Sequence, residues 1–140
     1  MYDFMESIDI KTVCGFYDRC IFETAYSTGT RINEILELKL DEIFLDDCMI
    51  KVTGKNNKQR MCILVPSAKK YLNFYIKKIR RCFLEKNAES NYVFPSVSGK
   101  KQTKTYIKRR IREYLKLSGI NKKVTFHMFR RSFATHLLEK

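Results

Sequence analysis

The sequence has no long apolar run and no leader-like start. No stretch reaches the roughly 20 apolar residues that a membrane-spanning helix needs, and Lys and Arg interrupt the sequence throughout its second part. The first ten residues, MYDFMESIDI, are acidic and lack a basic segment followed by an apolar one, as a secretory signal or transit peptide would have. We therefore expect a cytoplasmic protein without a membrane segment.

Closely spaced cysteine pairs are also missing. The five cysteines are an odd number and form no C-x-x-C motif, which argues against a disulfide framework or a zinc site. We expect reduced thiols, most of them small residues of the core. They are Cys14, Cys20, Cys48, Cys62 and Cys82.

Acidic residues are scarce in the second part of the chain. Residues 51–140 carry 24 Lys and Arg against 4 Asp and Glu, whereas residues 1–50 carry 4 against 11. The net charge of the whole chain is +13. So large an excess in a small protein indicates a polyanionic partner, most simply nucleic acid, that binds the second part. The same scarcity leaves no clustered carboxylates there, such as a two-metal nuclease requires.

Length and patterning predict one mainly helical α+β domain. The chain has 140 residues, 44% of them apolar, and shows no internal repeat or interior boundary. Apolar residues at helical spacing predict helices over 12–28 and 103–117, a short helix capped by Thr30 that can run to Leu40, and a long helix from Pro66 through Phe83. The long helix carries Ile76 and Ile79 on its apolar face, and Arg110 is expected among the basic residues that the helix over 103–117 presents to solvent. Between Asp41 and Pro66, β-branched and apolar runs separated by turns, including GKNNK, predict a three-stranded antiparallel sheet.

The last fifteen residues, FHMFRRSFATHLLEK, place His127 and Arg130 one turn apart at the start of an apolar helix. Residues at this spacing face the same way, so both side chains can bind one anion, naturally a phosphate, at the amino end of the helix. Alternatively, His127 caps the helix and Arg130 pairs with an acidic core neighbour. These two residues by themselves favour the alternative.

Two further motifs change that balance. Arg31 stands at a helix start in STGTRINEILELKLDEI, and Lys55 lies at the tip of the predicted hairpin VTGKNNKQR. Together with HMFRRSFATHLLE, these segments match T-G-x-R-x-x-E-[IL], G-K-x-N-K-x-R and H-x-x-R-x-[ST]-F-A-T-H-L-L-E. In order and spacing, the three motifs resemble the catalytic domain of the tyrosine recombinases, the phage-integrase family, over nearly the whole chain.

The resemblance implies helices packed around a small antiparallel sheet, with an active centre on a basic face that embraces duplex DNA. It places the family's catalytic arginines on Arg31 and Arg130, its hairpin lysine on Lys55 and its histidine on His127. Two guanidinium groups can hold the charged oxygens of a phosphodiester bidentately. The lysine is then a general acid for the leaving 5′-oxygen, and His127 assists proton transfer or holds the phosphate.

In this family a tyrosine attacks the phosphate, and the 3′-phosphotyrosyl link conserves the bond energy, so the resemblance implies no metal and no other cofactor. The family's nucleophile follows the H-x-x-R helix, and none of the eight tyrosines occupies that place. We therefore expect residues 1–140 to be a catalytic domain that lacks its carboxyl-terminal part and the amino-terminal core-binding domain. Family members act as tetramers on two DNA sites; this chain by itself is expected to be monomeric and inactive.

Basic residues in turns and loops are expected to reach the phosphates of double-stranded DNA without distorting a helix, although charge runs are also typical of solvated faces. They are Lys58, Arg60, Lys100, Lys101 and Lys104. Glu34, one turn after Arg31, is expected to orient that arginine or to close a helix-end hydrogen bond. Asn56 stands where the family's turn commonly has glycine, and His136 is expected to pack within its helix.

Two other functions stay open on the sequence. A non-catalytic DNA-binding module derived from a recombinase would bind DNA with steep salt dependence but form no covalent adduct. An RNA-binding or ribonuclease domain would keep the basic face. However, it would explain neither an arginine at a helix start nor a lysine at a hairpin tip.

Overall fold

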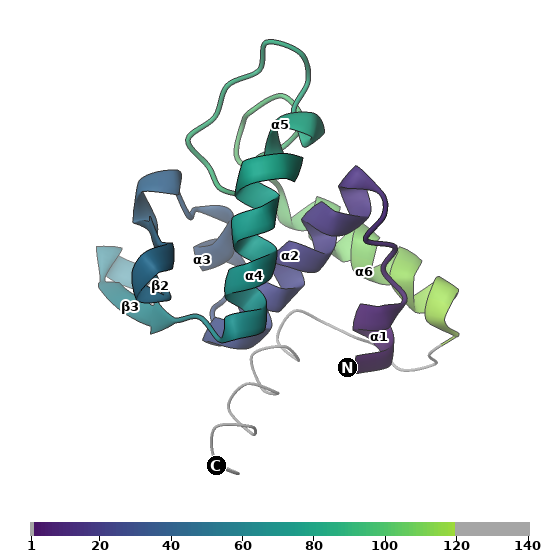
Figure 1. Cartoon of the computed structure of the whole chain (residues 1–140), viewed down its shortest axis with the longest axis horizontal. Coiled ribbons are helices and arrows are strands. Elements are labelled where there is room, and N and C mark those ends of the chain that lie inside the picture. Colours follow the sequence, from purple (N-terminus) through teal and green to yellow (C-terminus); the bar gives the residue numbers. More distant parts are fainter. Residues whose placement is uncertain (1, 120–140) are drawn as a thin grey trace.

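The computed structural model describes residues 2–119, so His127, Arg130 and His136 lie outside the described residues. The sheet and α3 lie on one side of the molecule, α1 and α6 lie on the other, and α2 and α4 run between them (Figure 1). No helix among residues 2–119 is long and apolar enough to cross a membrane. The helices are α1 (Tyr2–Glu6), α2 (Val13–Thr28), α3 (Ile32–Leu36), α4 (Pro66–Phe74), α5 (Arg80–Phe83) and α6 (Lys104–Ser118). The strands are β1 (Ile43–Phe44), β2 (Met49–Thr53) and β3 (Gln59–Ile63).

Helix α2 is the centre of the fold and confirms the helix predicted over residues 12–28. The Thr12 hydroxyl accepts a hydrogen bond from the Gly15 N–H at 2.9 Å and caps the first turn. Gly29 ends the helix with a φ of 65°, and its N–H donates to the Ala25 carbonyl. Because α2 contacts α3, α4, α5 and β3, most of its circumference is buried rather than one stripe.

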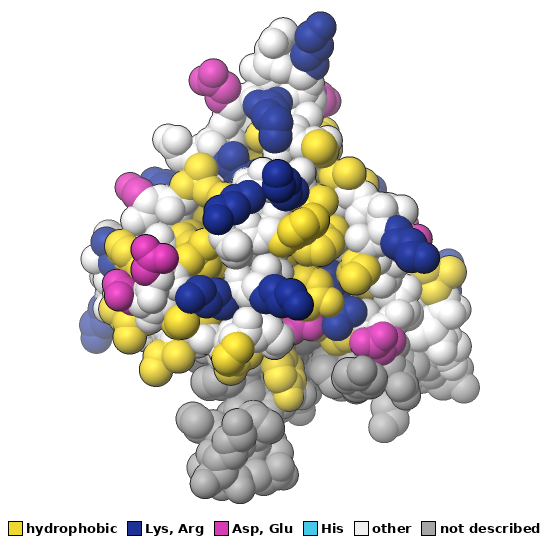
Figure 2. All heavy atoms as spheres, viewed as in Figure 1, with side chains coloured by type: hydrophobic (Ala, Val, Ile, Leu, Met, Phe, Trp, Pro, Cys, Tyr) yellow, Lys and Arg dark blue, Asp and Glu magenta, His cyan; other side chains and the backbone are white. Residues whose placement is uncertain are grey.

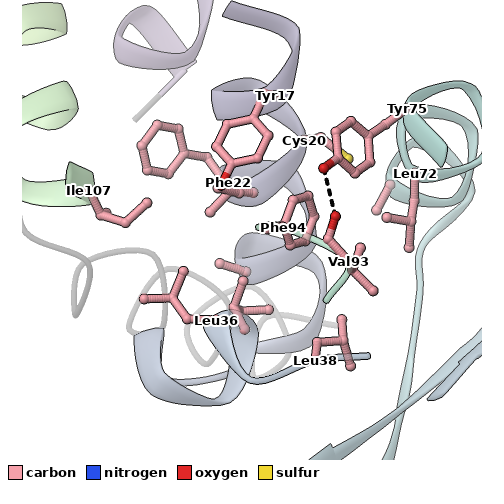
Figure 3. Close-up of a cluster of buried hydrophobic side chains, with 14 of the residues drawn as sticks. Tyr17, Cys20, Phe22, Leu36, Leu38, Leu72, Tyr75, Val93, Phe94 and Ile107 are labelled. Carbon is pink, nitrogen blue, oxygen red and sulfur yellow. Dashed lines mark hydrogen bonds between the residues drawn. The ribbon is translucent and has the colours of Figure 1, made fainter. Parts of the chain in front are cut away.

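Aromatic side chains from α2 and the following helices pack into one core with the segment around Phe94 (Figure 3). The rings of Tyr75 and Phe94 stack with centroids 5.1 Å apart. The Tyr75 hydroxyl donates to the Val93 carbonyl at 2.6 Å, and the Tyr17 hydroxyl donates to the Pro95 carbonyl at 2.7 Å. These hydrogen bonds satisfy the buried hydroxyls and hold the irregular segment against the helices.

The long helix predicted from Pro66 is interrupted. A wider π-helical turn, η4 (Tyr75–Ile79), separates α4 from α5. Ile76 and Ile79, predicted on one apolar face of this helix, pack against the core but are only partly buried, whereas Tyr75 is fully buried. A π-helical turn adds a residue to the helical repeat, so the face that meets the core shifts along the sequence.

The short helix predicted after Thr30 begins and ends differently. Arg31, with extended backbone angles of φ −83° and ψ 155°, is its N-cap, and α3 ends at Leu36 instead of continuing toward Leu40. Thr30 is fully buried, and its hydroxyl lies 3.0 Å from the Thr28 hydroxyl in a hydrogen bond. The cap prediction was wrong because the Thr30 hydroxyl forms its hydrogen bond with the Thr28 side chain and not with the backbone at the start of α3.

The three-stranded antiparallel sheet is confirmed. It has the order β1-β2-β3, and Val52 on β2 faces Arg60 on β3. Ile50, Val52 and Cys62 lie buried on the inner face of the sheet against the helices. The sheet therefore presents the turn between β2 and β3 at one end, away from the core.

The expectation that most cysteines belong to the core was wrong. Cys20 and Cys62 are buried, but Cys14 and Cys82 are exposed and Cys48 is partly exposed. All five thiols are free. Cys14 and Cys82 lie on helices whose other faces meet the core, so their side chains point to solvent.

Helix α6 follows its prediction closely, from a Thr103 cap to Gly119 at φ 69°. One predicted feature is wrong, because Arg110 was expected on the solvent face. Its Nε donates to the carboxylate of Asp18 at 2.6 Å, and the Tyr106 hydroxyl donates to the same carboxylate at 2.8 Å. The Tyr114 hydroxyl donates to it as well. This Asp18 network joins α2 to α6.

Four tyrosines whose hydroxyls donate hydrogen bonds within the protein are expected to stay protonated while it is folded. Burial raises the pKa of each of these phenols, which are Tyr17, Tyr75, Tyr106 and Tyr114. The unfolded chain releases their protons from about pH 10, so the free energy of unfolding should fall as the pH rises above that value. In an alkaline titration, their phenolate absorbance should appear only with unfolding. Ionisation of all eight tyrosines in a still-folded chain would contradict this.

Candidate nucleic-acid interface and active site

Arg31 stands at the start of α3 with an exposed side chain. Its backbone N–H donates to Glu34 Oε1 at 2.8 Å. Glu34 thus makes a helix-end hydrogen bond, one of the two supporting roles expected for it. Among residues 2–119, no carboxylate forms an ion pair with the Arg31 guanidinium, which leaves its donors facing solvent.

Lys55 lies exposed in the turn between β2 and β3, at the hairpin tip where it was predicted. The Gly54 N–H donates to the Lys58 carbonyl at 2.7 Å and closes the turn. Asn56 and Asn57 both have left-handed backbones, with φ values of 62° and 58°. Asparagine tolerates this region better than most residues, so Asn56 can occupy a position where glycine is common in the family.

The base of this hairpin packs directly against the first turn of α3. A Cβ added to Gly54 would lie 2.9 Å from Glu34 Oε2, so a side chain at this position would press on the Glu34 carboxylate. Arg60 on β3 donates a hydrogen bond to the same carboxylate from each terminal nitrogen, from Nη2 to Oε1 at 3.0 Å and from Nη1 to Oε2. The hydrogen bond to Glu34 raises the pKa of Arg60. The glycine allows the turn that carries Lys55 to lie beside Arg31.

A hollow of about 310 Å³ opens between these elements. Arg31 and Glu34 line it from α3, Thr53 and Gly54 line it from the hairpin, and Lys104 reaches it from the start of α6. The remaining lining residues are Ile32, Asn33 and Glu37. Segments distant in the sequence thus bring two exposed cations, Arg31 and Lys104, to one depression. The two carboxylates in its lining are each paired with another cation, Glu34 with Arg60 and Glu37 with Lys101.

The other residues predicted to contact DNA differ in their surroundings. Lys58 and Lys100 are exposed on turns. Lys101 Nζ lies 2.8 Å from Glu37 Oε1, but both side chains are close to half exposed, and such surface pairs contribute little to stability. Arg60 is the exception, since its guanidinium is held by Glu34.

Basic side chains also spread over the face shown in Figure 2, where several Lys and Arg side chains stand over α4 and α5 among apolar ones. They are not gathered into a single patch on that face. On that face the basic side chains are thus dispersed. The hollow beside Arg31 is distinguished by its geometry.

The sequence did not predict the pairing of Glu34 with Arg60, nor that Gly54 lies close to the Glu34 carboxylate. The motif G-K-x-N-K-x-R contains both Gly54 and Arg60, so it signalled their importance. It carried no sign that their partner is Glu34, 26 positions away from Arg60 along the chain.

Comparison with known proteins gives a consistent result. The model of the phage integrase family matches residues 1–140. The tyrosine recombinase XerD of Staphylococcus haemolyticus is 37% identical over 135 residues, which are 96% of this chain and 45% of that protein. The chain therefore spans slightly less than half the length of this relative.

Solved recombinase structures share the fold. The structure of XerA recombinase has a TM-score of 0.79 and 26% identity, over 98% of this chain and 47% of that one. The XerH site-specific recombinase in a pre-cleavage complex with its difH substrate also has a TM-score of 0.79 and 26% identity, over 99% of this chain and 41% of that one. With its motifs, its fold and a family match over its whole length, the chain belongs to the phage integrase family, as a catalytic domain of the tyrosine recombinase type.

Proposed function

We propose that the protein is a site-specific recombinase that breaks and rejoins double-stranded DNA through a 3′-phosphotyrosyl intermediate, without a metal or other cofactor. The observation that carries the proposal is the hollow in which Arg31 and Lys104 meet the base of the Lys55 hairpin. Membership of the family supports it, as does the fold shared with XerH, which was solved bound to its difH substrate.

Arg31 is proposed to hold the scissile phosphate. Its guanidinium is exposed and has no carboxylate partner among residues 2–119, so its fork of donors is available to two non-bridging oxygens. Charge on these oxygens grows as the phosphorus becomes five-coordinate, and donors fixed in advance stabilise that charge at no cost of reorganisation. We propose the same role for Arg130, the second arginine of the family pattern.

Lys55 is proposed as the general acid. When the tyrosine hydroxyl gives up its proton to solvent and its oxygen attacks phosphorus, a phosphorus–oxygen bond to tyrosine forms and the bond to the 5′-oxygen breaks. The departing 5′-oxygen then takes a proton from the Lys55 ammonium. Rejoining reverses each step, with a 5′-hydroxyl returning its proton to Lys55 as it attacks. His127 is proposed to assist this proton transfer or to hold the phosphate.

The nucleophile is proposed to be a tyrosine that follows the H-x-x-R motif, beyond Lys140, so that this chain alone does not cleave DNA. The interior tyrosines of the described region do not suit the role. Tyr17 and Tyr75 are fully buried, and the hydroxyls of Tyr106 and Tyr114 donate to Asp18. Burial raises the pKa of all four phenols, whereas a nucleophile needs a phenol that loses its proton readily.

The DNA backbone is proposed to lie along the basic residues around the hollow. Lys58, Lys100, Lys101 and Lys104 are exposed and can neutralise phosphates on either side of the reacting one. We further propose that the whole protein carries an amino-terminal core-binding domain and acts as a tetramer on two DNA sites, whereas this chain alone is monomeric. Each neutralised phosphate should add about 0.9 to the slope of log affinity against log salt concentration.

The test is covalent trapping. The protein made from its native gene is incubated with a nicked duplex selected from random sequences by its binding, so that cleavage releases a short fragment and prevents rejoining. We expect a protein–DNA adduct that survives denaturing detergent, is destroyed by protease and is absent from the Arg31→Ala variant. Duplex binding without any adduct would favour the non-catalytic DNA-binding module. A preference for single-stranded RNA over duplex DNA would favour the RNA-binding alternative.

A further inference from the structure

We infer that Arg60 is a positioning residue, and not a DNA ligand, whose pairing with Glu34 keeps that carboxylate away from Arg31 and leaves the Arg31 guanidinium available for phosphate. Arg60 was expected to contact DNA as one of the basic residues in turns and loops that can reach phosphates without distorting a helix. The part of the inference that concerns phosphate rests on the proposed function. The part that concerns the three side chains rests on their geometry alone.

Both oxygens of the Glu34 carboxylate are engaged by Arg60. Oε1 accepts from Arg60 Nη2 at 3.0 Å as well as from the Arg31 N–H, and Oε2 accepts from Arg60 Nη1. The Glu34 side chain is only 6% exposed, whereas the Arg60 side chain is 44% exposed. A carboxylate so deeply buried needs a cation beside it, because its charge is costly to remove from water.

Among residues 2–119, Arg31 is a cation close enough to Glu34 to take the place of Arg60. It precedes Glu34 by one helical turn, a spacing at which side chains are neighbours, and its own N–H is already bonded to the carboxylate. Without Arg60, the buried carboxylate would attract the Arg31 guanidinium and occupy the donors that the phosphate needs. Arg60 therefore prevents an internal ion pair in the active site.

The same contact determines where the hairpin lies. Arg60 faces Val52 across the β2–β3 ladder, and a Cβ added to Gly54 would lie 2.9 Å from Glu34 Oε2 and 3.5 Å from Arg60 Nη1. One carboxylate therefore joins the start of α3 to the base of the turn that carries Lys55. Loss of Arg60 should disturb the arginine and the lysine together.

The proposal can be tested with three variants, Arg60→Gln, Glu34→Gln and the double variant. Glutamine at position 34 still offers an oxygen to the Arg31 N–H, because glutamine serves at the third helical position as glutamate does. The double variant therefore keeps the helix cap while it removes the charge that would capture Arg31. Circular dichroism checks that each variant is folded.

The first readout needs no DNA. The Nε–Hε resonance of Arg31 is followed by NMR, together with its exchange with water, which slows when the guanidinium is ion-paired. We expect Arg60→Gln to shift this resonance and slow its exchange several-fold, and the double variant to return both to wild-type values. The proposal would be overturned if Arg60→Gln left the Arg31 resonance unchanged, or if the resonance stayed shifted in the double variant.

The second readout is the salt dependence of binding to a random-sequence duplex. Arg31→Ala should lower the slope of log affinity against log salt by about 0.9, and Arg60→Gln should lower it equally, because each removes one phosphate contact. The double variant should restore the slope. If Arg60 itself bound phosphate, adding Glu34→Gln would restore nothing. As a matched control, Lys58→Gln on the same hairpin should lower the slope without shifting the Arg31 resonance.

The two readouts separate the inference from the proposed function. If Arg31→Ala leaves the slope unchanged while the resonance behaves as expected, the phosphate role fails and the side-chain pairing stands. If Arg60→Gln does not fold, Arg60→Lys replaces it, because a lysine keeps the carboxylate paired. A single ammonium covers less of the carboxylate than a guanidinium fork, so the Arg31 resonance should then shift part of the way. A resonance identical to wild type would overturn the proposal.

Discussion

Arg31→Lys is expected to slow formation of the covalent protein–DNA adduct by a factor of about 10²–10³ in the protein made from its native gene. The charge is conserved, but lysine offers a single ammonium in place of a planar fork, so two non-bridging oxygens can no longer be held in fixed geometry. The measurement is the single-turnover rate on a nicked duplex at saturating protein. DNA affinity should change far less than the rate, because the charge remains.

A matched substitution separates this effect from a general one. Arg112 is exposed on α6 and does not line the hollow, so Arg112→Lys should leave the rate unchanged. A rate for Arg31→Lys within about threefold of wild type would remove Arg31 from the catalytic residues, since a lost preorganised donor costs far more. An equal loss of rate in Arg31→Lys and Arg112→Lys would indicate that the substitutions disturb the fold and not a specific phosphate contact.

Asp18→Ala should destabilise the protein by about 3–5 kcal/mol, the cost of removing one partner of a buried ion pair. Asp18 is 1% exposed and receives hydrogen bonds from Arg110 and from the hydroxyls of Tyr106 and Tyr114. Without the carboxylate, these three donors lose their acceptor at the α2–α6 contact. Urea unfolding followed by circular dichroism measures the loss as a lower midpoint at an unchanged slope.

Two controls test this explanation. Glu113 pairs with Arg110 at 2.7 Å from a side chain that is 49% exposed, so Glu113→Gln should cost less than about 1 kcal/mol. Asp18→Asn keeps an acceptor oxygen but loses the charge, and should fall between the two. Burial raises the pKa of Asp18 while Tyr114 and Arg110 act against that rise, so the carboxylate depends on these partners. A cost for Asp18→Ala as small as that of Glu113→Gln would contradict the network's importance.

The helices that the sequence predicted best are those with local signals at both ends. Helix α2 has Thr12 before it and Gly29 after it, and α6 has Thr103 and Gly119 in the same places. A cap acts within a few residues of itself, so it can be predicted without the rest of the fold. The π-helical turn after α4 has no such signal, because the packing of Tyr75 against the core decides it.

The candidate site divides in the same way. Arg31 and Lys55 were predicted from motifs, and the structure places them on a helix start and a hairpin tip whose base packs beside that helix. Their roles in catalysis stay predictions, as do those of His127 and Arg130. In the sequence, Lys58 and Arg60 are both basic residues of one hairpin. Only the structure shows that Lys58 is exposed, whereas the Arg60 guanidinium is hydrogen-bonded to Glu34.

By itself, the sequence determined the family, the class of fold, the order of most elements and the residues on which the family's catalytic pattern falls. The family and its catalytic positions follow from the resemblance of three motifs to those of the tyrosine recombinases. The class of fold and the order of elements follow from spacing, capping and turn chemistry, all of which act over short distances along the chain. The tertiary structure alone decided which charged side chains form ion pairs with distant residues. Glu34 meets Arg60 and Asp18 meets Arg110 across 26 and 92 residues. Such long-range pairs depend on strand register and helix packing, which no local pattern specifies.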